Sequence, residues 1–253
     1  MSQLSRRRFA GLTVGSVAMT ALSLKSMLAQ TAAPTATGVV PTPAMGTPTK
    51  KLALGMVVFE GFELLDVFGP LEMFGGVRDK VDIYIIAERM GPVKSSAGPA
   101  VVVDRTMADA GALDIVMIPG GGGTRREVNN AAFLASFKAL AEATPQVATI
   151  CTGSAVLART GLLDGIKATT NKRAYAWATS QGAKVNWVPE ARWVEDGKYF
   201  SSSGISAGMD MALGLIAKLF GRETAERVAN GTEYHWNSDS HVDPFAKMNG
   251  LVK

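Results

Sequence analysis

Cysteine and histidine are scarce in this chain of 253 residues, which contains one cysteine and two histidines. A single cysteine excludes an intramolecular disulfide and a zinc site built from several thiolates. Two histidines, both near the C-terminus, leave too few imidazoles for a histidine-rich metal centre. The sequence therefore points to no thiolate or histidine-rich metal site, and no metal is expected.

A strong charge imbalance is missing as well. The formal net charge is +4, and this excess is equal to the four basic residues near the N-terminus, Arg6, Arg7, Arg8 and Lys25. Without those four residues, 22 of the 26 basic residues remain and balance the 22 acidic ones, and no basic run remains, so nucleic acid is not an expected partner. The hydrophobic fraction of 47% provides enough apolar material for one sizeable core or two small ones.

The first fifty residues differ in composition from the rest. Residues 5–9 read Ser-Arg-Arg-Arg-Phe, which is typical of a twin-arginine export signal, and the apolar stretch 10–24 is too short for a comfortable membrane span. Residues 1–30 are therefore predicted to be a signal peptide, cleaved within 29–33; an amphipathic or anchoring helix is the alternative. Residues 31–50, rich in Thr, Ala, Pro and Gly, are predicted to be a flexible linker. We expect a periplasmic protein with no stable membrane association after processing.

Residues 51–253 alternate between strand and helix patterns. Apolar runs bounded by turns predict buried strands, and helical periodicity predicts helices. The predicted strands are 52–59, 81–87, 115–118, 147–150 and 168–170, and a hairpin joins 193–195 to 198–201. The predicted helices are 64–74, 130–142 with Asn130 as its cap, one ending near Thr160, 172–181, 206–220 and 223–230. This alternation predicts a doubly wound, mostly parallel α/β domain, followed by an irregular C-terminal tail from about residue 232.

The turn at residues 150–154, Ile-Cys-Thr-Gly-Ser, carries the only cysteine. It joins an apolar strand to a helix, which is the geometry of a nucleophile elbow, and places Cys151 at a helix N-terminus. A positive helix end favours a thiolate, so the pKa of Cys151 is predicted to lie below the free value of about 8.5. The alternative is a buried cysteine that acts as a small hydrophobic residue, although Thr-Gly-Ser is more typical of a turn than of a core.

A second turn, Pro119 to Gly123, contains four consecutive glycines after the strand 115–118. So many glycines indicate a sharp bend or a close approach of backbone to another group. In a doubly wound sheet, ligands bind beyond the carboxyl ends of the strands, and both this loop and Cys151 lie there. The two turns predict one small-molecule site.

Four short motifs occur in a fixed order along the chain. They are Leu65-Asp66-Val67-Phe68-Gly69-Pro70, Ile118-Pro119-Gly120-Gly121, Ile150-Cys151-Thr152-Gly153 and Ser206-Ala207-Gly208-Met209-Asp210. Together they resemble the ThiJ/PfpI family of the class I glutamine-amidotransferase-like superfamily, over roughly residues 51–231. The resemblance implies a single flavodoxin-like domain. It is strongest to the branch that contains isonitrile hydratase, because the first motif has aspartate where other branches have glutamate.

The resemblance implies roles for individual residues. Cys151 matches the nucleophile, and Asp66 matches the acidic residue that meets its sulfur. A carboxyl in a half-buried pocket tends to have a raised pKa and can then deliver a proton; the alternative is a helix N-terminal aspartate that complements the dipole. The backbone N–H groups of Gly121 and Thr152 match an oxyanion hole.

Asn171 departs from the pattern of other branches. Protease and glyoxalase-like branches have a histidine at this position, and asparagine cannot act as a general base. Asn171 and Gly120 are weaker candidates for substrate binding. His235 and His241 lie too far along the chain to align with this position, although either could fold back over the site. Asp210 is expected to cap its helix or to bind a neighbouring loop.

These features predict a cysteine-dependent hydratase that resembles isonitrile hydratase. It would add water to an isocyanide-like carbon and give an N-substituted formamide, with no metal or organic cofactor. Two alternatives stay open: a redox-sensing, stress-sensing or protein-protective module without turnover, and an amidase- or peptidase-type hydrolase whose base is His235 or His241. The resemblance also implies a homodimer acting on a small-molecule substrate.

Overall fold

The computed structural model describes residues 50–253. The predicted signal peptide, and the predicted linker apart from Lys50, lie outside the described residues. Within residues 50–253, none of the helices is both long enough and apolar enough to cross a membrane.

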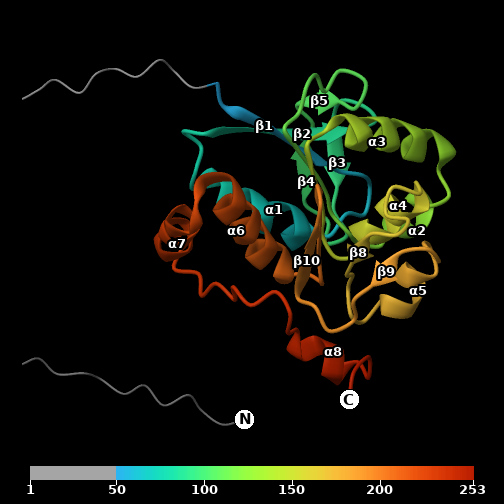
Figure 1. Cartoon of the computed structure of the whole chain (residues 1–253). Helices are drawn as coiled ribbons and strands as arrows, with labels where there is room; N and C mark the ends of the chain where they lie inside the picture. Colours follow the sequence, from blue (N-terminus) through green and yellow to red (C-terminus); the bar gives the residue numbers. More distant parts are fainter. Residues whose placement is uncertain (1–49) are drawn as a thin grey trace, which may run out of the picture. The chain divides into compact units, whose positions relative to one another are not determined.

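A seven-stranded sheet lies at the centre of the domain (Figure 1). In spatial order its strands are β10 (Trp193–Asp196), β11 (Tyr199–Ser202), β7 (Gln146–Thr149), β6 (Ile115–Ile118), β1 (Leu52–Val57), β2 (Val81–Ala87) and β5 (Arg105–Thr106). β10 and β11 form the predicted antiparallel hairpin, and every other neighbouring pair is parallel. The order confirms the predicted doubly wound, flavodoxin-like α/β fold.

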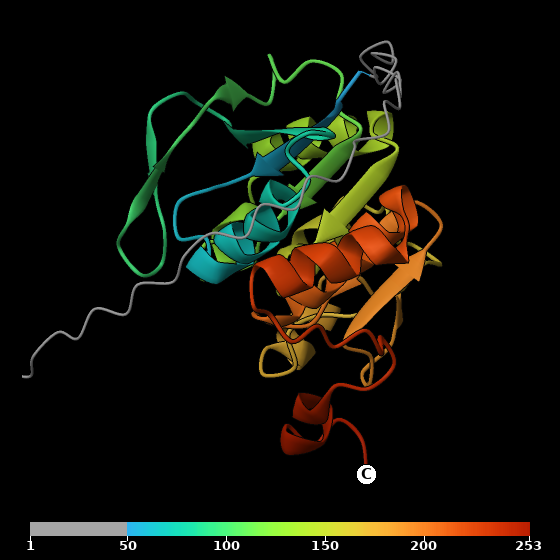
Figure 2. The same ribbon diagram turned by 90° about the vertical axis from the view of Figure 1, so that its left-hand side faces the viewer.

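The central strands are continuous apolar runs because both of their faces are covered. All four residues of β6 are buried, as are the last four of β1. Helices α1 (Leu64–Gly75), α6 (Ala207–Phe220) and α7 (Arg222–Gly231) cover one face of the sheet. Helices α2 (Thr124–Glu127), α3 (Ala131–Ala143) and α4 (Gly153–Arg159) cover the other (Figures 1 and 2). This covering explains why the strand pattern lacks polar alternation.

Glycines bring α1 and α6 close together beneath the site. A Cβ at Gly69 would lie 2.8 Å from the Met209 side chain, and one at Gly208 would lie 3.3 Å from the Pro70 ring. Asn130 caps α3 as predicted, because its side chain accepts a hydrogen bond from the N–H of Phe133 at 3.2 Å.

Two predicted elements are shorter than expected. The strand predicted at 168–170 is only β8 (Lys167–Ala168), which pairs with β9 (Asn186–Trp187) outside the main sheet. The strand ends there because the N–H of Thr169 donates to the side-chain hydroxyl of Ser201 in β11 at 2.9 Å instead of to a backbone carbonyl. The helix predicted at 172–181 is only α5 (Tyr175–Thr179). The small antiparallel pair β3 (Pro92–Lys94) and β4 (Ala100–Val102) lies apart from the main sheet.

The segment from Thr232 onward runs back across the lower end of the sheet in Figure 2 and ends near α8 (Pro244–Met248). Its backbone is tied to the loop before β10: Arg192 N–H donates to Ser240 O at 2.9 Å, and Asp243 N–H donates to Glu190 O at 2.8 Å. The tail is therefore attached to the domain beside the carboxyl ends of the strands.

Candidate active site

Cys151 sits directly after β7 in a backbone conformation that few non-glycine residues adopt, with a φ of 56°. Its backbone is held on both sides. Its N–H donates to Ser202 O at 3.2 Å, and its carbonyl accepts from the hydroxyls of Ser154 at 3.0 Å and Thr170 at 3.1 Å. Such strain persists only where surrounding contacts enforce it. The predicted elbow is therefore present, and its neighbours fix its shape.

The glycine loop after β6 packs against this elbow. A Cβ at Gly120 would lie 2.5 Å from both the N and the Oγ1 of Thr152, so only glycine fits there. Gly121 has a φ of 116°, and a Cβ on it would lie 2.4 Å from the backbone N of Glu63. These close approaches bring the turns after β6 and β7 and the start of α1 to one point.

Asp66 lies in the first turn of α1 and is fully buried. Its Oδ2 accepts a hydrogen bond from the N–H of Gly120 at 2.8 Å, whereas its Oδ1 is buried with no hydrogen-bond partner. Burial, opposed by the hydrogen bond from Gly120 and aided by the nearby charge of Glu63, raises the pKa of Asp66 to about 8. The carboxyl therefore holds its proton at neutral pH.

The thiol of Cys151 is 5% exposed, and Asn171 Nδ2 donates to its sulfur at 3.2 Å. Burial raises the pKa of Cys151 well above its usual value, and the charge of Asp66 raises it further. The prediction of a lowered pKa is therefore wrong. The Thr152 N–H and the Asn171 amide favour the thiolate, but desolvation outweighs them.

Asn171 is held in one orientation. Its Oδ1 accepts from the N–H of Ala174 at 2.9 Å, which directs Nδ2 to the sulfur of Cys151. The space for this amide comes from Gly204, where a Cβ would lie 1.9 Å from Asn171 Nδ2. The structure thus brings Asn171 to the nucleophile as a hydrogen-bond donor.

The two predicted oxyanion-hole donors lie together, but one of them is engaged. The N–H of Gly121 donates to Thr152 Oγ1 at 3.1 Å, and the Thr124 hydroxyl lies 3.3 Å from the same oxygen. The N–H of Thr152 instead faces the Cys151 sulfur and favours its thiolate. The Thr152 hydroxyl must turn away before Gly121 can donate to a bound substrate.

Arg125 is a site neighbour that the sequence reasoning missed. Its guanidinium lies 3.8 Å from the centre of the Trp177 ring and donates to the Thr124 hydroxyl at 3.0 Å. Burial lowers the pKa of Arg125, while the charge of Cys151 opposes this shift. The only sequence signal was its place two residues after Gly123, the end of the glycine loop, and no spacing rule connects it to Cys151.

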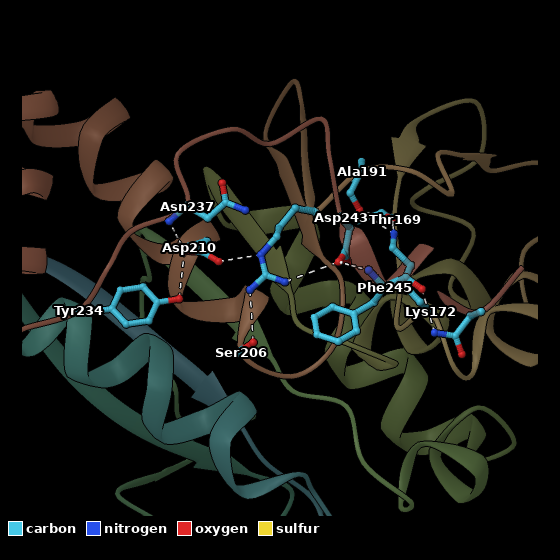
Figure 3. A network of polar contacts seen from close by, with 11 residues as sticks. Thr169, Lys172, Ala191, Ser206, Asp210, Tyr234, Asn237, Asp243 and Phe245 are labelled. Atoms are coloured by element: carbon cyan, nitrogen blue, oxygen red, sulfur yellow. Dashed lines mark hydrogen bonds and ion pairs between the residues drawn. The ribbon is translucent and has the colours of Figure 1, made fainter. Parts of the chain in front are cut away.

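Asp210 does not reach the thiol and instead holds the tail (Figure 3). Its carboxylate accepts from Arg192 Nε at 2.8 Å, the Tyr234 hydroxyl at 3.0 Å and the Asn237 N–H at 2.9 Å. Asp210 therefore binds a neighbouring segment, one of the two roles expected for it.

Neither histidine supplies a base to this centre. Within residues 50–253, no hydrogen bond joins the side chain of His235 or His241 to Cys151 or Asp66. His235 lines a separate surface hollow beside α7. The same part of the chain contains no group of three or more His, Cys, Asp or Glu side chains placed to hold a metal ion.

Comparison with known proteins gives the domain a family. The model of the DJ-1/PfpI family matches residues 53–218. The chain belongs to the DJ-1/PfpI family. This membership confirms the resemblance on which the residue roles depend. The chain is 33% identical over 184 residues to isonitrile hydratase from Pseudomonas putida, covering 72% of this chain and 78% of that protein.

Another similar protein is named as a regulator and not as an enzyme. The HTH-type transcriptional regulator GbdR of Pseudomonas aeruginosa is 28% identical over 182 residues, covering 70% of this chain and 49% of the regulator. A crystal structure of a ThiJ/PfpI family protein from Pseudomonas syringae has a TM-score of 0.69 at 29% identity, covering 84% of this chain and 91% of that one. Since the relatives include an enzyme and a regulator, the family alone does not establish turnover.

Proposed function

We propose that this protein is a cysteine-dependent hydratase that adds water to an isocyanide-like carbon and releases an N-substituted formamide. One observation carries the proposal: a buried Asp66 carboxyl, with one oxygen unpartnered, lies against the only cysteine at a strained elbow. The identity of 33% to an isonitrile hydratase supports the same substrate class.

In the first step the sulfur of Cys151 bonds to the terminal carbon of R–N≡C. Asp66 gives its proton to that carbon and takes the proton of the thiol in return. The product is a thioimidate, R–N=CH–S–Cys151, and Asp66 is protonated again. A positioned acid of this kind contributes about 10²–10⁴-fold to a rate. The raised pKa of Asp66, to about 8, keeps this proton in place at neutral pH.

In the second step water adds to the thioimidate carbon while the nitrogen gains a proton. The C–S bond of the tetrahedral intermediate then breaks, R–NH–CHO leaves, and the sulfur regains a proton. The N–H of Thr152 and the amide of Asn171 face the sulfur and can stabilise the negative charge that develops as it leaves. All atoms of the substrate and of one water are present in the formamide.

The second candidate function is a sensor without turnover, which the similarity to the regulator GbdR supports. The state of the thiol argues against a redox sensor. Sensor cysteines are low in pKa and accessible, whereas Cys151 is buried with a raised pKa. No second cysteine is present to resolve an oxidised sulfur. The hydrolase hypothesis needs a histidine base, and among the described residues no histidine is hydrogen-bonded to the Cys151 sulfur.

The direct test is isocyanide turnover by the purified domain, followed as formamide release. We expect Cys151→Ala to abolish turnover and Asp66→Asn to reduce it by about 10²–10⁴-fold. His235→Ala and His241→Ala serve as controls and should retain wild-type turnover. Full activity in Asp66→Asn would contradict the proton transfer, and no isocyanide turnover in the wild type would contradict the function.

A further inference from the structure

A hollow of about 420 Å³ opens beside the nucleophile. Its wall includes Asn171, the residue that donates to the Cys151 sulfur, and Leu65, the neighbour of Asp66. The remaining wall comes from Lys172 and Arg173, from the loop at residues 203–206 and from Phe245 and Asn249 in the tail. The hollow therefore meets the reacting pair through Asn171 and Leu65, and Cys151 and Asp66 are not part of its wall.

The side chains at its mouth are apolar. Leu65 is 40% exposed, Ile205 is 38% exposed and Phe245 is 45% exposed. They come from three distant parts of the chain and converge only in the fold. Apolar surface that stays exposed at a functional site is typical of a site for an apolar group.

Two polar side chains of the wall, those of Lys172 and Ser206, are already engaged, whereas Arg173 is exposed at its edge. Lys172 is buried, and its Nζ donates to Thr169 Oγ1 at 2.7 Å and to Ala191 O at 2.6 Å. The Ser206 hydroxyl accepts from Arg192 Nη2 at 3.2 Å (Figure 3). An apolar ligand group in the hollow would therefore leave these polar groups satisfied.

Phe245 is fixed in place by a buried network, although it lies in the tail. Asp243 caps α8 by accepting from the Phe245 N–H at 3.1 Å (Figure 3). The Asp243 carboxylate lies 3.7 Å from Arg192 Nη1, and Arg192 binds Asp210 at 2.8 Å. These groups are buried, so the wall has a defined position.

We propose that this hollow binds the apolar nitrogen substituent of the substrate and that Phe245 sets the preference for bulky or aromatic substituents. The identity of the substrate rests on the proposed function, but the hollow can be tested without it. The family match ends at residue 218, so α8 lies beyond the matched segment. The preference for bulky or aromatic substituents would therefore depend on Phe245, a residue outside the segment that the family model matches.

The test compares two alkylating reagents that differ only in an apolar group. Iodoacetamide and N-benzyl iodoacetamide react with the same sulfur, and the ratio of their rate constants reports the benzyl group alone. Rates are measured on the folded protein at alkaline pH, with denatured protein as the reference for intrinsic reactivity. Because the raised thiol pKa slows both reagents alike, it cancels in the ratio.

We expect the folded wild type to favour the benzyl reagent relative to denatured protein and Phe245→Ala to lower this ratio about tenfold. Phe245→Leu should retain most of it. Phe68→Ala is the matched control, because Phe68 is 48% exposed and lies outside the hollow. Met248→Ala, on the same helix α8 but outside the wall, should also leave the ratio unchanged.

An unchanged ratio in Phe245→Ala would overturn the proposal. Reaction of neither reagent until denaturation would also overturn it, because the hollow would then not lead to the sulfur. Failure of the proposed function is a separate outcome: the benzyl preference would depend on Phe245 while no isocyanide is hydrated. The opposite outcome is also possible to recognise. If wild type and Phe245→Ala hydrate cyclohexyl and methyl isocyanide with the same selectivity, the proposed function is supported and the role of the hollow is rejected.

Discussion

Asp66 and Cys151 are two acidic groups that are buried in the same site. Desolvation raises both pKa values, that of the carboxyl to about 8 and that of the thiol well above its usual value. Both groups are therefore neutral at physiological pH. A neutral pair suits the addition of S–H across an isocyanide carbon, because carbon must receive a proton as sulfur attaches.

The pH dependence of the rate follows from Asp66. Because the carboxyl must be protonated to act, kcat/KM should be high at neutral pH and should fall as the pH rises through about 8. The charge of Glu63 helps to raise the pKa of Asp66. Glu63→Gln should therefore lower this pKa and move the falling limb to lower pH.

The measurement is the pH profile of kcat/KM for isocyanide hydration in wild type and Glu63→Gln. Glu72→Gln is the control, because this exposed residue lies on the same helix α1 and is not among the groups that shift Asp66. A falling limb at the same pH in Glu63→Gln, or one displaced upward, would contradict the role of Asp66 as the acid.

The thiol should respond to Asp66 in the opposite sense. The charge of Asp66 raises the pKa of Cys151, so Asp66→Asn should lower it and bring the midpoint of iodoacetamide alkylation to a lower pH. In the wild type, alkylation should accelerate only at pH values above the free-cysteine pKa of about 8.5. Cys151→Ala gives the background rate, and an unchanged midpoint in Asp66→Asn would rule out this coupling.

Single residues could be predicted from the sequence only in part. The elbow pattern pointed to Cys151, and the family resemblance of the first motif pointed to Asp66. The direction of the thiol pKa was not predictable, because it depends on burial created by distant elements. The place of Arg125 at the site likewise depends on its stacking with Trp177, 52 positions away along the chain by their numbering.

At the scale of elements, the strands were readable because both faces of the sheet are buried, which makes β1 and β6 continuous apolar runs. The region after β8 was misread as a longer strand and a longer helix. There the backbone of Thr169 bonds to the side chain of Ser201, and the backbone N–H of Ala174 bonds to Asn171. Such side-chain contacts compete with regular structure and leave no periodic signal.

The loop at residues 203–206 positions Asn171, and Gly204→Ala tests this. The new Cβ would lie 1.9 Å from Asn171 Nδ2 and would displace the amide from the sulfur. We expect kcat/KM for isocyanide hydration to fall roughly tenfold to hundredfold, because small displacements at a reacting centre are costly.

The matched control is Gly75→Ala, at the end of α1, where a Cβ would meet no atom within 4 Å. It should leave turnover unchanged, and thermal unfolding should show that both variants are folded. Wild-type turnover in a folded Gly204→Ala protein would show that the orientation of Asn171 does not matter.

At the scale of the whole molecule, one family fold serves an isonitrile hydratase and a transcriptional regulator among the relatives of this chain. The family model matches residues 53–218 of this chain, a range that contains the elbow. The tail from Thr232, bound through Asp210 and Arg192, lies beyond this range and adds a wall beside the site. The homodimer stays a prediction, which light scattering of the purified protein would check.

The location of the molecule is the last property that its sequence predicts. The pair Arg6-Arg7 within residues 5–9 is typical of a twin-arginine signal, and this route carries proteins that have already folded. A chain with one cysteine needs no oxidising compartment to form disulfides, so folding before export is compatible with its composition.

Replacing Arg6 and Arg7 together by lysine preserves the charge and should nevertheless retain the protein in the cytoplasm. Arg8→Lys is the control, because it makes the same chemical change outside the pair and should leave export intact. Fractionation of cells and N-terminal sequencing of the periplasmic form check both points, with a new N-terminus expected within residues 29–33. Periplasmic accumulation of the double variant, or an uncleaved native N-terminus, would contradict export by this route.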